Sequence, residues 1–162
     1  MSSEFEPRDK QFARRVRASF AAQPYVNFLG AELATVGPGY CEIRLRQRQA
    51  LRQQHGYIHG GAIASILDSA AGYAAMTLVP PRTGVLTVEY KLNFVRPARG
   101  AAIVARGRVV KPGRTLTVVQ ADAFLSGESK EELCATSIQT LIAIPGLSER
   151  APARRPRNST RR

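Results

Sequence analysis

The stretch that decides the fold is His59-Gly60-Gly61-Ala62-Ile63-Ala64-Ser65-Ile66-Leu67-Asp68-Ser69-Ala70-Ala71-Gly72-Tyr73-Ala74-Ala75-Met76. With histidines counted as neutral, Asp68 is the only charged residue between Gln53 and Pro81. The pattern predicts a helix over residues 62–78 that is apolar on nearly every face and is therefore buried. Burying a lone carboxylate is costly unless it is paired, hydrogen-bonded or solvated in a cavity. Asp68 is therefore the first candidate for a functional side chain.

The length of 162 residues predicts one main domain with a substantial core, and 44% of the residues are hydrophobic. No uninterrupted apolar run reaches the roughly 20 residues that a membrane-spanning helix needs. The N-terminus lacks the apolar region of a signal peptide, so we expect a cytoplasmic protein. Cys41 and Cys134 stand alone in expected strands, which favours buried, reduced thiols. His55 and His59 lie in a glycine-broken loop, and we expect no metal site there.

The net charge of +12 is unevenly distributed along the chain. Residues 149–162 contribute +5, from six arginines and one acid. This stretch has no apolar periodicity, so residues 147–162 are predicted to be a disordered basic tail. Such a tail could keep the protein soluble, or it could touch nucleic acid and anionic surfaces without specificity. The remaining chain divides into an N-terminal extension with an amphipathic helix, residues 1–19, and a single domain, residues 20–146.

The remaining pattern predicts one further helix and a set of strands. An apolar stripe of Phe12, Val16 and Phe20 indicates a helix over 9–22, which Pro24 is expected to end. Next come a packed turn over 28–33 that leads into a strand, a turn at 37–39, and a strand over 40–46. Four meandering strands are expected after the long helix, over 85–94, 101–110, 115–125 and 133–144. Because a helix that is apolar all round must be wrapped, we predict an α+β fold with a curved antiparallel sheet around it.

One combination of residues resembles a known family. His59-Gly60-Gly61 is followed by Asp68 seven residues later and preceded by Gln53. This arrangement resembles the hotdog-fold acyl-CoA thioesterases of the PaaI type, in the 4-hydroxybenzoyl-CoA thioesterase superfamily. The similarity extends over residues 20–146, and residues 53–56 with 71–75 resemble the branch for medium- and long-chain acyl-CoA esters. It implies a hotdog fold and hydrolysis of acyl-CoA to free acid and coenzyme A.

The resemblance also implies a division of roles. Asp68 would activate the hydrolytic water or attack the thioester carbonyl itself. Gly60 would offer its backbone N–H to the developing oxyanion at the start of the helix, where the helix dipole favours negative charge. Gln53 would orient the water or thioester, His59 would hold the loop and polarise the site, and Thr87 would help to place the water.

Substrate binding is assigned to Gly61 and to two cations, Lys111 and Arg114, which would bind the phosphates of coenzyme A. Coenzyme A is part of the substrate, and no separate cofactor is implied. Each role has a structural alternative. Asp68 could be held by a neighbouring hydroxyl on Ser65 or Thr87, His59 could tie the loop to the backbone, the glycines could permit tight packing, and the two cations could be plain hairpin residues.

Helix geometry adds an argument that is independent of the resemblance. Gly60 and Asp68 are eight residues apart, which is about 12 Å along a helix axis. A carbonyl carbon and its attacking group must approach to about 3 Å. One helix therefore cannot present both groups to the same carbon, whereas two antiparallel helices from two subunits can. We expect a homodimer, or a tetramer of two dimers.

Two other function classes compete with the enzyme. A dehydratase of the same architecture would need a differently placed histidine and acid on the helix, which this sequence lacks. A non-catalytic acyl-CoA-binding regulator could use the basic tail to contact nucleic acid. The chain has no helix-turn-helix, zinc motif or aromatic-rich reader of single strands, so we expect no specific nucleic-acid partner.

Overall fold

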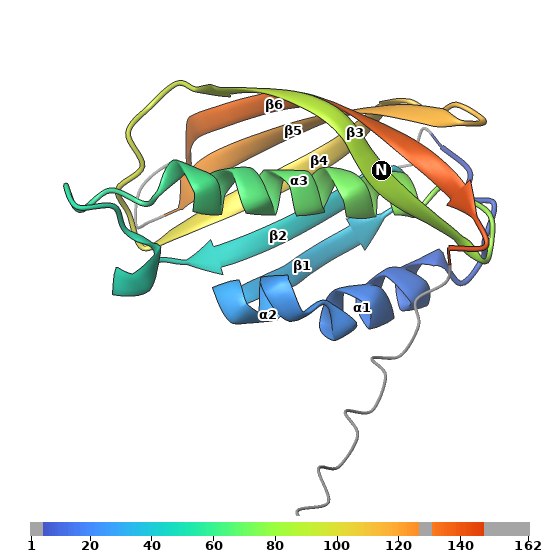
Figure 1. The fold of residues 1–162 in the computed structure, drawn as a ribbon, viewed down its shortest axis with the longest axis horizontal. Coiled ribbons are helices and arrows are strands. Elements are labelled where there is room, and N and C mark those ends of the chain that lie inside the picture. The colour runs from blue at the N-terminus through green and yellow to red at the C-terminus, as the bar shows by residue number, and fades with distance from the viewer. Residues whose placement is uncertain (1–4, 127–130, 148–162) are drawn as a thin grey trace, which may run out of the picture.

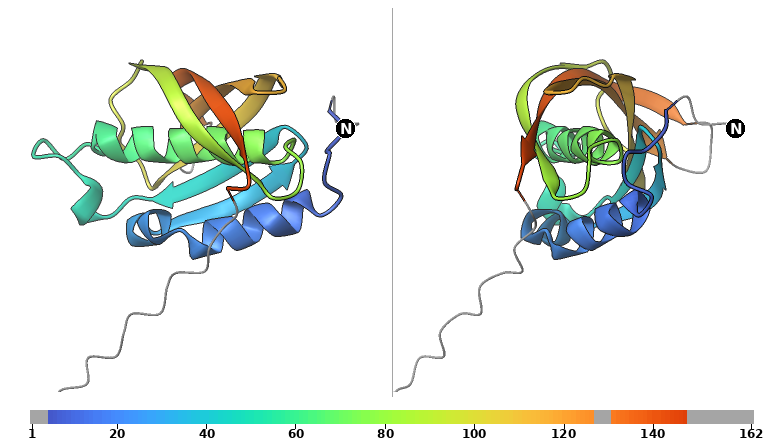
Figure 2. Two further views of the ribbon diagram at one scale, coloured as in Figure 1. Left: turned by 45° about the vertical axis from the view of Figure 1, so that its right-hand side comes forward. Right: turned by 90° about the vertical axis from the view of Figure 1, so that its right-hand side faces the viewer.

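The computed structural model describes residues 5–126 and 131–147. Except for Leu147, the predicted basic tail lies outside the described residues. An antiparallel sheet of six strands curves around one long helix, α3, as Figures 1 and 2 show from three directions. The predicted α+β fold is therefore confirmed.

The strands are β1 (Ala31–Gly37), β2 (Tyr40–Arg46), β3 (Thr83–Phe94), β4 (Ala102–Lys111), β5 (Leu116–Ser126) and β6 (Glu132–Pro145). Their order across the sheet is β1-β2-β4-β5-β6-β3, and each neighbouring pair is antiparallel. The helices are α1 (Phe12–Ala22), α2 (Pro24–Leu29) and α3 (Gly60–Met76), with a short 3-10 helix, η1 (Gln49–Leu51). The central strands β2, β4 and β5 lie behind α3 in Figure 1.

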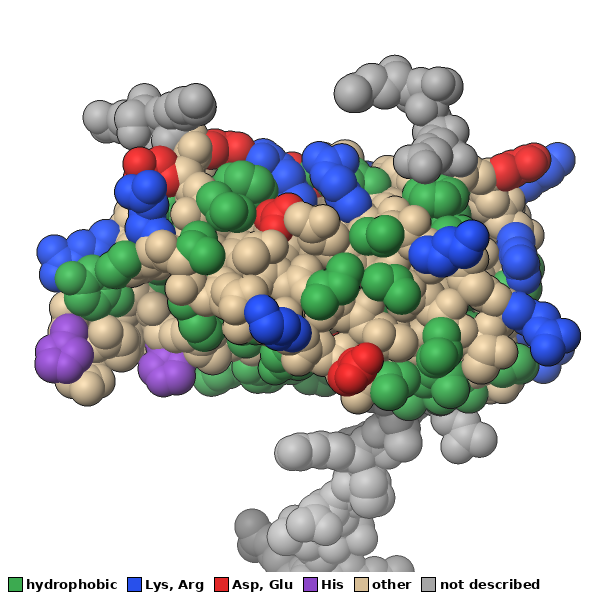
Figure 3. Space-filling model, turned by 90° about the horizontal axis from the view of Figure 1, so that it is seen from above, with side chains coloured by type: hydrophobic (Ala, Val, Ile, Leu, Met, Phe, Trp, Pro, Cys, Tyr) green, Lys and Arg blue, Asp and Glu red, His purple; other side chains and the backbone are tan. Residues whose placement is uncertain are grey.

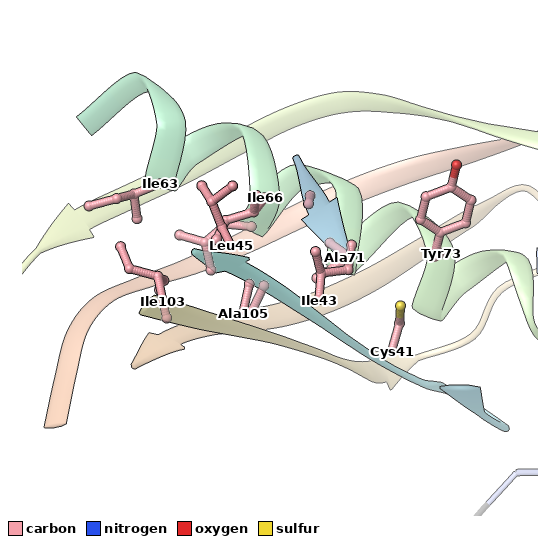
Figure 4. Close-up of a cluster of buried hydrophobic side chains, with 14 of the residues drawn as sticks. Cys41, Ile43, Leu45, Ile63, Ile66, Ala71, Tyr73, Ile103 and Ala105 are labelled. Carbon is pink, nitrogen blue, oxygen red and sulfur yellow. The ribbon is translucent and has the colours of Figure 1, made fainter. Parts of the chain in front are cut away.

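The core lies between α3 and the concave face of the sheet. Ile66 of α3, Ile43 of β2 and Ile103 of β4 are completely buried there, and Figure 4 shows these side chains meeting between helix and sheet. Gly107 of β4 sets the spacing, because a Cβ atom at this position would lie 2.4 Å from the carbonyl oxygen of Ala70. The missing side chain lets the helix backbone rest directly on the strand.

The sheet leaves one stripe of α3 uncovered. Gly61 is exposed, and the residues that follow it on the same face of the helix are only partly buried; they are Ala64, Ser65, Asp68, Ser69 and Gly72. Their spacing of three and four residues is that of a single helix face. The prediction that α3 is buried holds for the rest of its surface, and Asp68 lies on the open stripe.

Helix α1 is joined to the end of α3 by one arginine. The Arg15 guanidinium donates hydrogen bonds of 3.0 to 3.1 Å to the carbonyl oxygens of Met76, Val79, Pro80 and Thr83. The carbonyl groups at a helix C-terminus have no partner within the helix. Arg15 satisfies one of them and three more in the turn that follows, so it fixes both the end of α3 and the start of β3.

Two sequence-based expectations about the elements are incomplete, and a third is wrong. Pro24 ends α1, but it also begins α2, because proline is well suited to the first position of a helix. Residues 31–37 form a complete strand, which pairs with β2 through a tight hairpin at 38–39. Strand β3 does not meander into β4, because it pairs with β6 at the far edge of the sheet.

Candidate active site

The Asp68 carboxylate lies on the open stripe of α3 and accepts a hydrogen bond from β3. The Thr87 hydroxyl Oγ1 lies 2.7 Å from Asp68 Oδ1. Ser65, the other hydroxyl considered from sequence, donates instead to the Gly61 carbonyl at 2.7 Å and lies 2.8 Å from the Tyr25 hydroxyl. Within residues 5–126 and 131–147, Asp68 forms no ion pair. It is therefore a half-buried carboxylate with a single hydroxyl donor.

A β-bulge in β3 aims Thr87 at the helix. The register with β6 shifts between Thr87 and Glu89, which leaves Val88 as the extra residue. Thr87 lies opposite the buried Leu141, and Tyr90 lies opposite the buried Gln139. Since both partners face α3, the bulge turns two positions three residues apart to the same side of the strand, which an unbroken strand could not do.

The first turn of α3 presents an unpaired backbone donor. His59 is the N-cap, and its Nδ1 accepts the Gly61 N–H at 2.9 Å. In the part of the chain that the structure describes, no acceptor for the Gly60 N–H is present. The helix begins two residues earlier than its apolar pattern predicts, because the cap residue and not the pattern fixes its start. Gly60 thus offers a free N–H at the positive end of the helix dipole.

Gln53 lies in the loop that leads to α3. Its Oε1 accepts the His55 N–H at 2.5 Å, and its own N–H donates to the Tyr57 carbonyl at 2.9 Å. The side chain is partly buried and borders neither of the two cavities that meet at Asp68. Within one chain, Gln53 and Asp68 are therefore not brought together.

Two cavities flank the open stripe of α3, and Asp68 borders both. The larger, of about 770 Å³, runs beside the C-terminal half of α3 between α1 and β3. The smaller, of about 570 Å³, runs beside the N-terminal half and includes His59, Gly61 and Tyr90. The structure therefore places Asp68 at the junction of the two cavities, with Thr87 on the wall of the larger one.

The two predicted phosphate-binding cations lie at the other end of the helix. Lys111 ends β4, and Arg114 follows in the hairpin to β5. The neighbouring start of β2 is fixed to the C-cap of α3, because the Gly39 N–H donates to Thr77 Oγ1 at 2.8 Å. Within one chain these cations are thus a helix length away from Gly60, and neither borders either cavity.

Sequence reasoning missed two polar residues that border both cavities with Asp68: Gln23, between α1 and α2, and Ser69. Ser69 follows the carboxylate directly and could have been noticed as part of the polar stripe on α3. Gln23 carries no such signal, since its place depends on how α1 and α2 fold back over the open side of α3.

The resolved electrostatic shifts lie away from this junction. Hydrogen bonds to Glu131 and Glu42 raise the pKa of Arg106, and the Arg106 partner lowers the pKa of Glu131. Burial raises the pKa of Cys41 to about 12 and that of Cys134 to about 11. Both cysteines are buried and free, as predicted. Among the described residues no group of three or more His, Cys, Asp or Glu side chains is placed to hold a metal ion.

Comparison with known proteins identifies the family. The family model for the thioesterase superfamily matches residues 55–132. A Saccharolobus solfataricus protein named putative esterase is 32% identical over 116 residues, which cover 72% of this chain and 75% of the relative. Mouse acyl-coenzyme A thioesterase 13 is 29% identical over 83 residues, covering 51% of this chain and 57% of the relative.

Solved structures agree. A thioesterase family protein from Silicibacter pomeroyi is 47% identical with a TM-score of 0.81, and the match covers 83% of this chain and 99% of that one. The PaaI protein of Escherichia coli, at 17% identity, shares the fold, with a TM-score of 0.76 over 84% of this chain and 95% of that one. The chain belongs to the thioesterase superfamily, and the predicted hotdog fold is confirmed.

The family membership supports a thioester hydrolase as the general activity. No helix among the described residues has both the length and the apolar character needed to cross a membrane. Figure 3, a view from above Figure 1, shows hydrophobic side chains spread among polar ones, with both histidines at one end of the molecule.

Proposed function

We propose that the protein hydrolyses acyl-CoA thioesters to a free acid and coenzyme A, with Asp68 as its catalytic carboxylate. The observation that carries the proposal is the position of Asp68: half-buried, without an ion pair to any described residue, held by Thr87, and bordering two cavities. A carboxylate in this setting is free to take a proton from water or to attack a carbonyl carbon.

In the water-activating form of the reaction, Asp68 accepts a proton while the water oxygen bonds to the thioester carbon. The carbonyl oxygen becomes an oxyanion, which the Gly60 N–H stabilises at a helix N-terminus. The C–S bond then breaks, and the coenzyme A thiolate leaves and takes up a proton. In the nucleophilic form, Asp68 Oδ bonds to the carbon, the C–S bond breaks to release the coenzyme A thiolate, and water then hydrolyses the resulting mixed anhydride. Thr87 orients the carboxylate in both forms.

We further propose that the site is shared between two copies of the chain. Along one α3 helix, Gly60 and Asp68 are about 12 Å apart, too far to act on one carbon. Two antiparallel α3 helices, meeting along their open stripes, would set Asp68 of one chain against the first turn of the other. The same pairing would bring Gln53, in the loop just before the partner's first turn of α3, to the site from the partner.

Strand β3 supports this assembly. It is an edge of the six-stranded sheet, and its side chains Leu86, Val88 and Tyr90 are 50 to 58% exposed. A long edge strand with exposed apolar side chains is a template for pairing with another chain. Pairing β3 with β3 of a second copy would cover this edge and bring the open sides of the two α3 helices together.

The test is release of coenzyme A from a panel of short, aromatic and long acyl-CoA esters, followed through the new thiol. We expect the wild-type protein to release thiol from at least one ester. Asp68→Asn should lose more than nine tenths of this activity, a barrier increase above about 1.4 kcal/mol, while keeping its fold and oligomeric state. Retention of more than about a tenth of the wild-type rate would remove Asp68 from the centre of the mechanism.

A further inference from the structure

The larger cavity points to a specificity-determining residue beyond the groups that perform the chemistry. We propose that Gly72 sets which acyl chains the site accepts, by leaving open the passage from Asp68 into this cavity. The inference rests on the proposed function, since it assigns the cavity to the acyl group of the same substrate.

The position of Gly72 follows from helix geometry. Asp68, Gly72 and Met76 are spaced four residues apart, so they follow one another along one face of α3, and all three border the larger cavity. Gly72 is therefore the first position that a chain leaving the carboxylate would pass. A Cβ atom placed there would meet only the Leu141 Cδ2 atom, at 3.9 Å, which is an ordinary van der Waals contact. A larger side chain at this position would thus point towards the Leu141 side chain of β6, which borders the same cavity.

The walls beyond Gly72 suit a hydrocarbon chain. They are formed chiefly by Met76, Val85, Leu86, Leu141 and Leu147. Two arginines border the far part of the cavity: Arg15 is committed to four carbonyl oxygens, whereas Arg82 is exposed at the rim. Apolar walls of this extent favour an unbranched alkyl chain over a short acyl group.

The length of the passage indicates the size of the chain. From Asp68 to Met76 the helix rises about 12 Å. A zigzag alkyl chain advances roughly 1.3 Å for each C–C bond of about 1.5 Å, so this distance holds about nine carbons. We therefore infer that a medium-length alkyl chain fills the cavity, and that decanoyl-CoA is a better substrate than butanoyl-CoA.

The experiment is a size series at one position: Gly72→Ala, Gly72→Val and Gly72→Leu. For each variant, kcat/KM is measured with butanoyl-CoA and with decanoyl-CoA, and oligomeric state is measured by light scattering. Gly72→Ala is the matched control, because it replaces the flexible glycine while adding only one methyl group. We expect Gly72→Leu to lower the decanoyl to butanoyl ratio at least about tenfold, with Gly72→Val between alanine and leucine. If Gly72→Leu does not fold, the decanoyl to butanoyl ratio of Gly72→Val, compared with that of Gly72→Ala, tests the inference instead.

Equal losses on both esters, or no loss on either, would overturn the assignment while leaving the proposed hydrolysis intact. A changed oligomeric state with an unchanged decanoyl to butanoyl ratio of kcat/KM would indicate that a partner subunit occupies the cavity. That result would also overturn the assignment of Gly72. If the wild type hydrolyses only aromatic esters of the panel, the inference fails and the proposed function stands. If it hydrolyses no ester of the panel, the proposed function fails. The inference is then judged by binding of butyl and decyl thioethers of coenzyme A, which cannot be hydrolysed. Gly72→Leu should weaken the decyl compound alone, and equal weakening or none would contradict the inference.

Discussion

Asp68 and Thr87 show how two residues far apart in sequence come into hydrogen-bond contact. Asp68 is a lone acid in an apolar helix, and Thr87 reaches it only because a bulge turns that position of β3 towards α3. A hydroxyl that donates to one carboxylate oxygen restricts the rotation of the carboxylate. The other carboxylate oxygen can still accept a hydrogen bond or a proton. The bond therefore holds the Asp68 carboxylate in one orientation.

Replacing Thr87 with valine, which has a similar shape and no hydroxyl, should lower kcat. A hydrogen bond to a charged group contributes about 1.5–3 kcal/mol, so we expect a loss of about ten- to a hundredfold if this bond orients the carboxylate. Thr87→Ser keeps the hydroxyl and should retain most of the activity. Steady-state kinetics on one acyl-CoA ester measures the difference, and equal activity of the two variants would contradict an orienting role.

The two thiols give a prediction for alkaline pH. Because burial raises the pKa of Cys41 to about 12 and that of Cys134 to about 11, from an ordinary 9, both are protonated in the folded protein at pH 8. A thiol reagent should therefore label neither until the protein unfolds, so the enzyme's own thiols should not disturb a thiol-release assay. Rapid labelling of the native protein at pH 8 would contradict their burial.

The same two pKa values have a consequence for stability. Above pH 9 the unfolded chain loses the thiol protons while the folded chain retains them, so the free energy of unfolding should fall as pH rises through the window from 9 to about 12. Replacing both cysteines with alanine should reduce that slope. Urea titrations at pH 8 and pH 10 on both proteins measure it, and identical slopes would contradict the prediction.

At the scale of elements, Arg15 couples α1 to the end of α3. Removing its guanidinium would leave several carbonyl groups near the helix end without their donor. We expect Arg15→Gln to lower the free energy of unfolding by about 1–3 kcal/mol. Arg14→Gln changes an exposed neighbour on the same helix and should have a small effect. Urea denaturation of both variants is the measurement, and equal losses would show that the carbonyl contacts add no stability.

The sequence predicts the elements best where a single physical signal decides them. The apolar stretch of α3 and the alternation in β2, β4, β5 and β6 depend on local periodicity, and their positions agree closely with the structure. The bounds of β1 are not predicted from the sequence, because buried and exposed residues do not alternate regularly along this strand. The pairing of β3 with β6 is decided by long-range contacts and by a seven-residue connection, 95–101, neither of which leaves a periodic pattern.

The residues of the candidate site also differ in how far the sequence predicts their positions. Asp68 and Thr87 are predicted from sequence and lie in hydrogen-bond contact, whereas Gln53, Lys111 and Arg114 lie away from Asp68 in a single chain. The role of Arg15 is missed because an arginine on an amphipathic helix looks like any solvated charge. Its partners are backbone carbonyls, which carry no sequence signal.

For the whole molecule, the open side of the sheet is the decisive feature. Figure 2 shows the sheet curving around α3 without closing, and the two cavities, the open stripe of α3 and the edge of β3 all lie on that side. A second copy placed there would cover apolar surface and complete the reacting groups at once. We therefore propose a shared site in which Asp68 of one chain acts opposite the Gln53 loop of another.

Mixing two inactive variants tests this claim most directly. Asp68→Asn and Gln53→Ala proteins are each assayed alone, then mixed in equal amounts, allowed to exchange subunits, and assayed again, with exchange verified by mass tags. A mixed dimer contains one site that has both groups intact. Because half of a randomly exchanged population is mixed and each mixed dimer has one intact site of two, we predict recovery of about a quarter of the wild-type activity. Verified exchange with no recovery above the separate variants would place both groups in one chain and contradict the shared site.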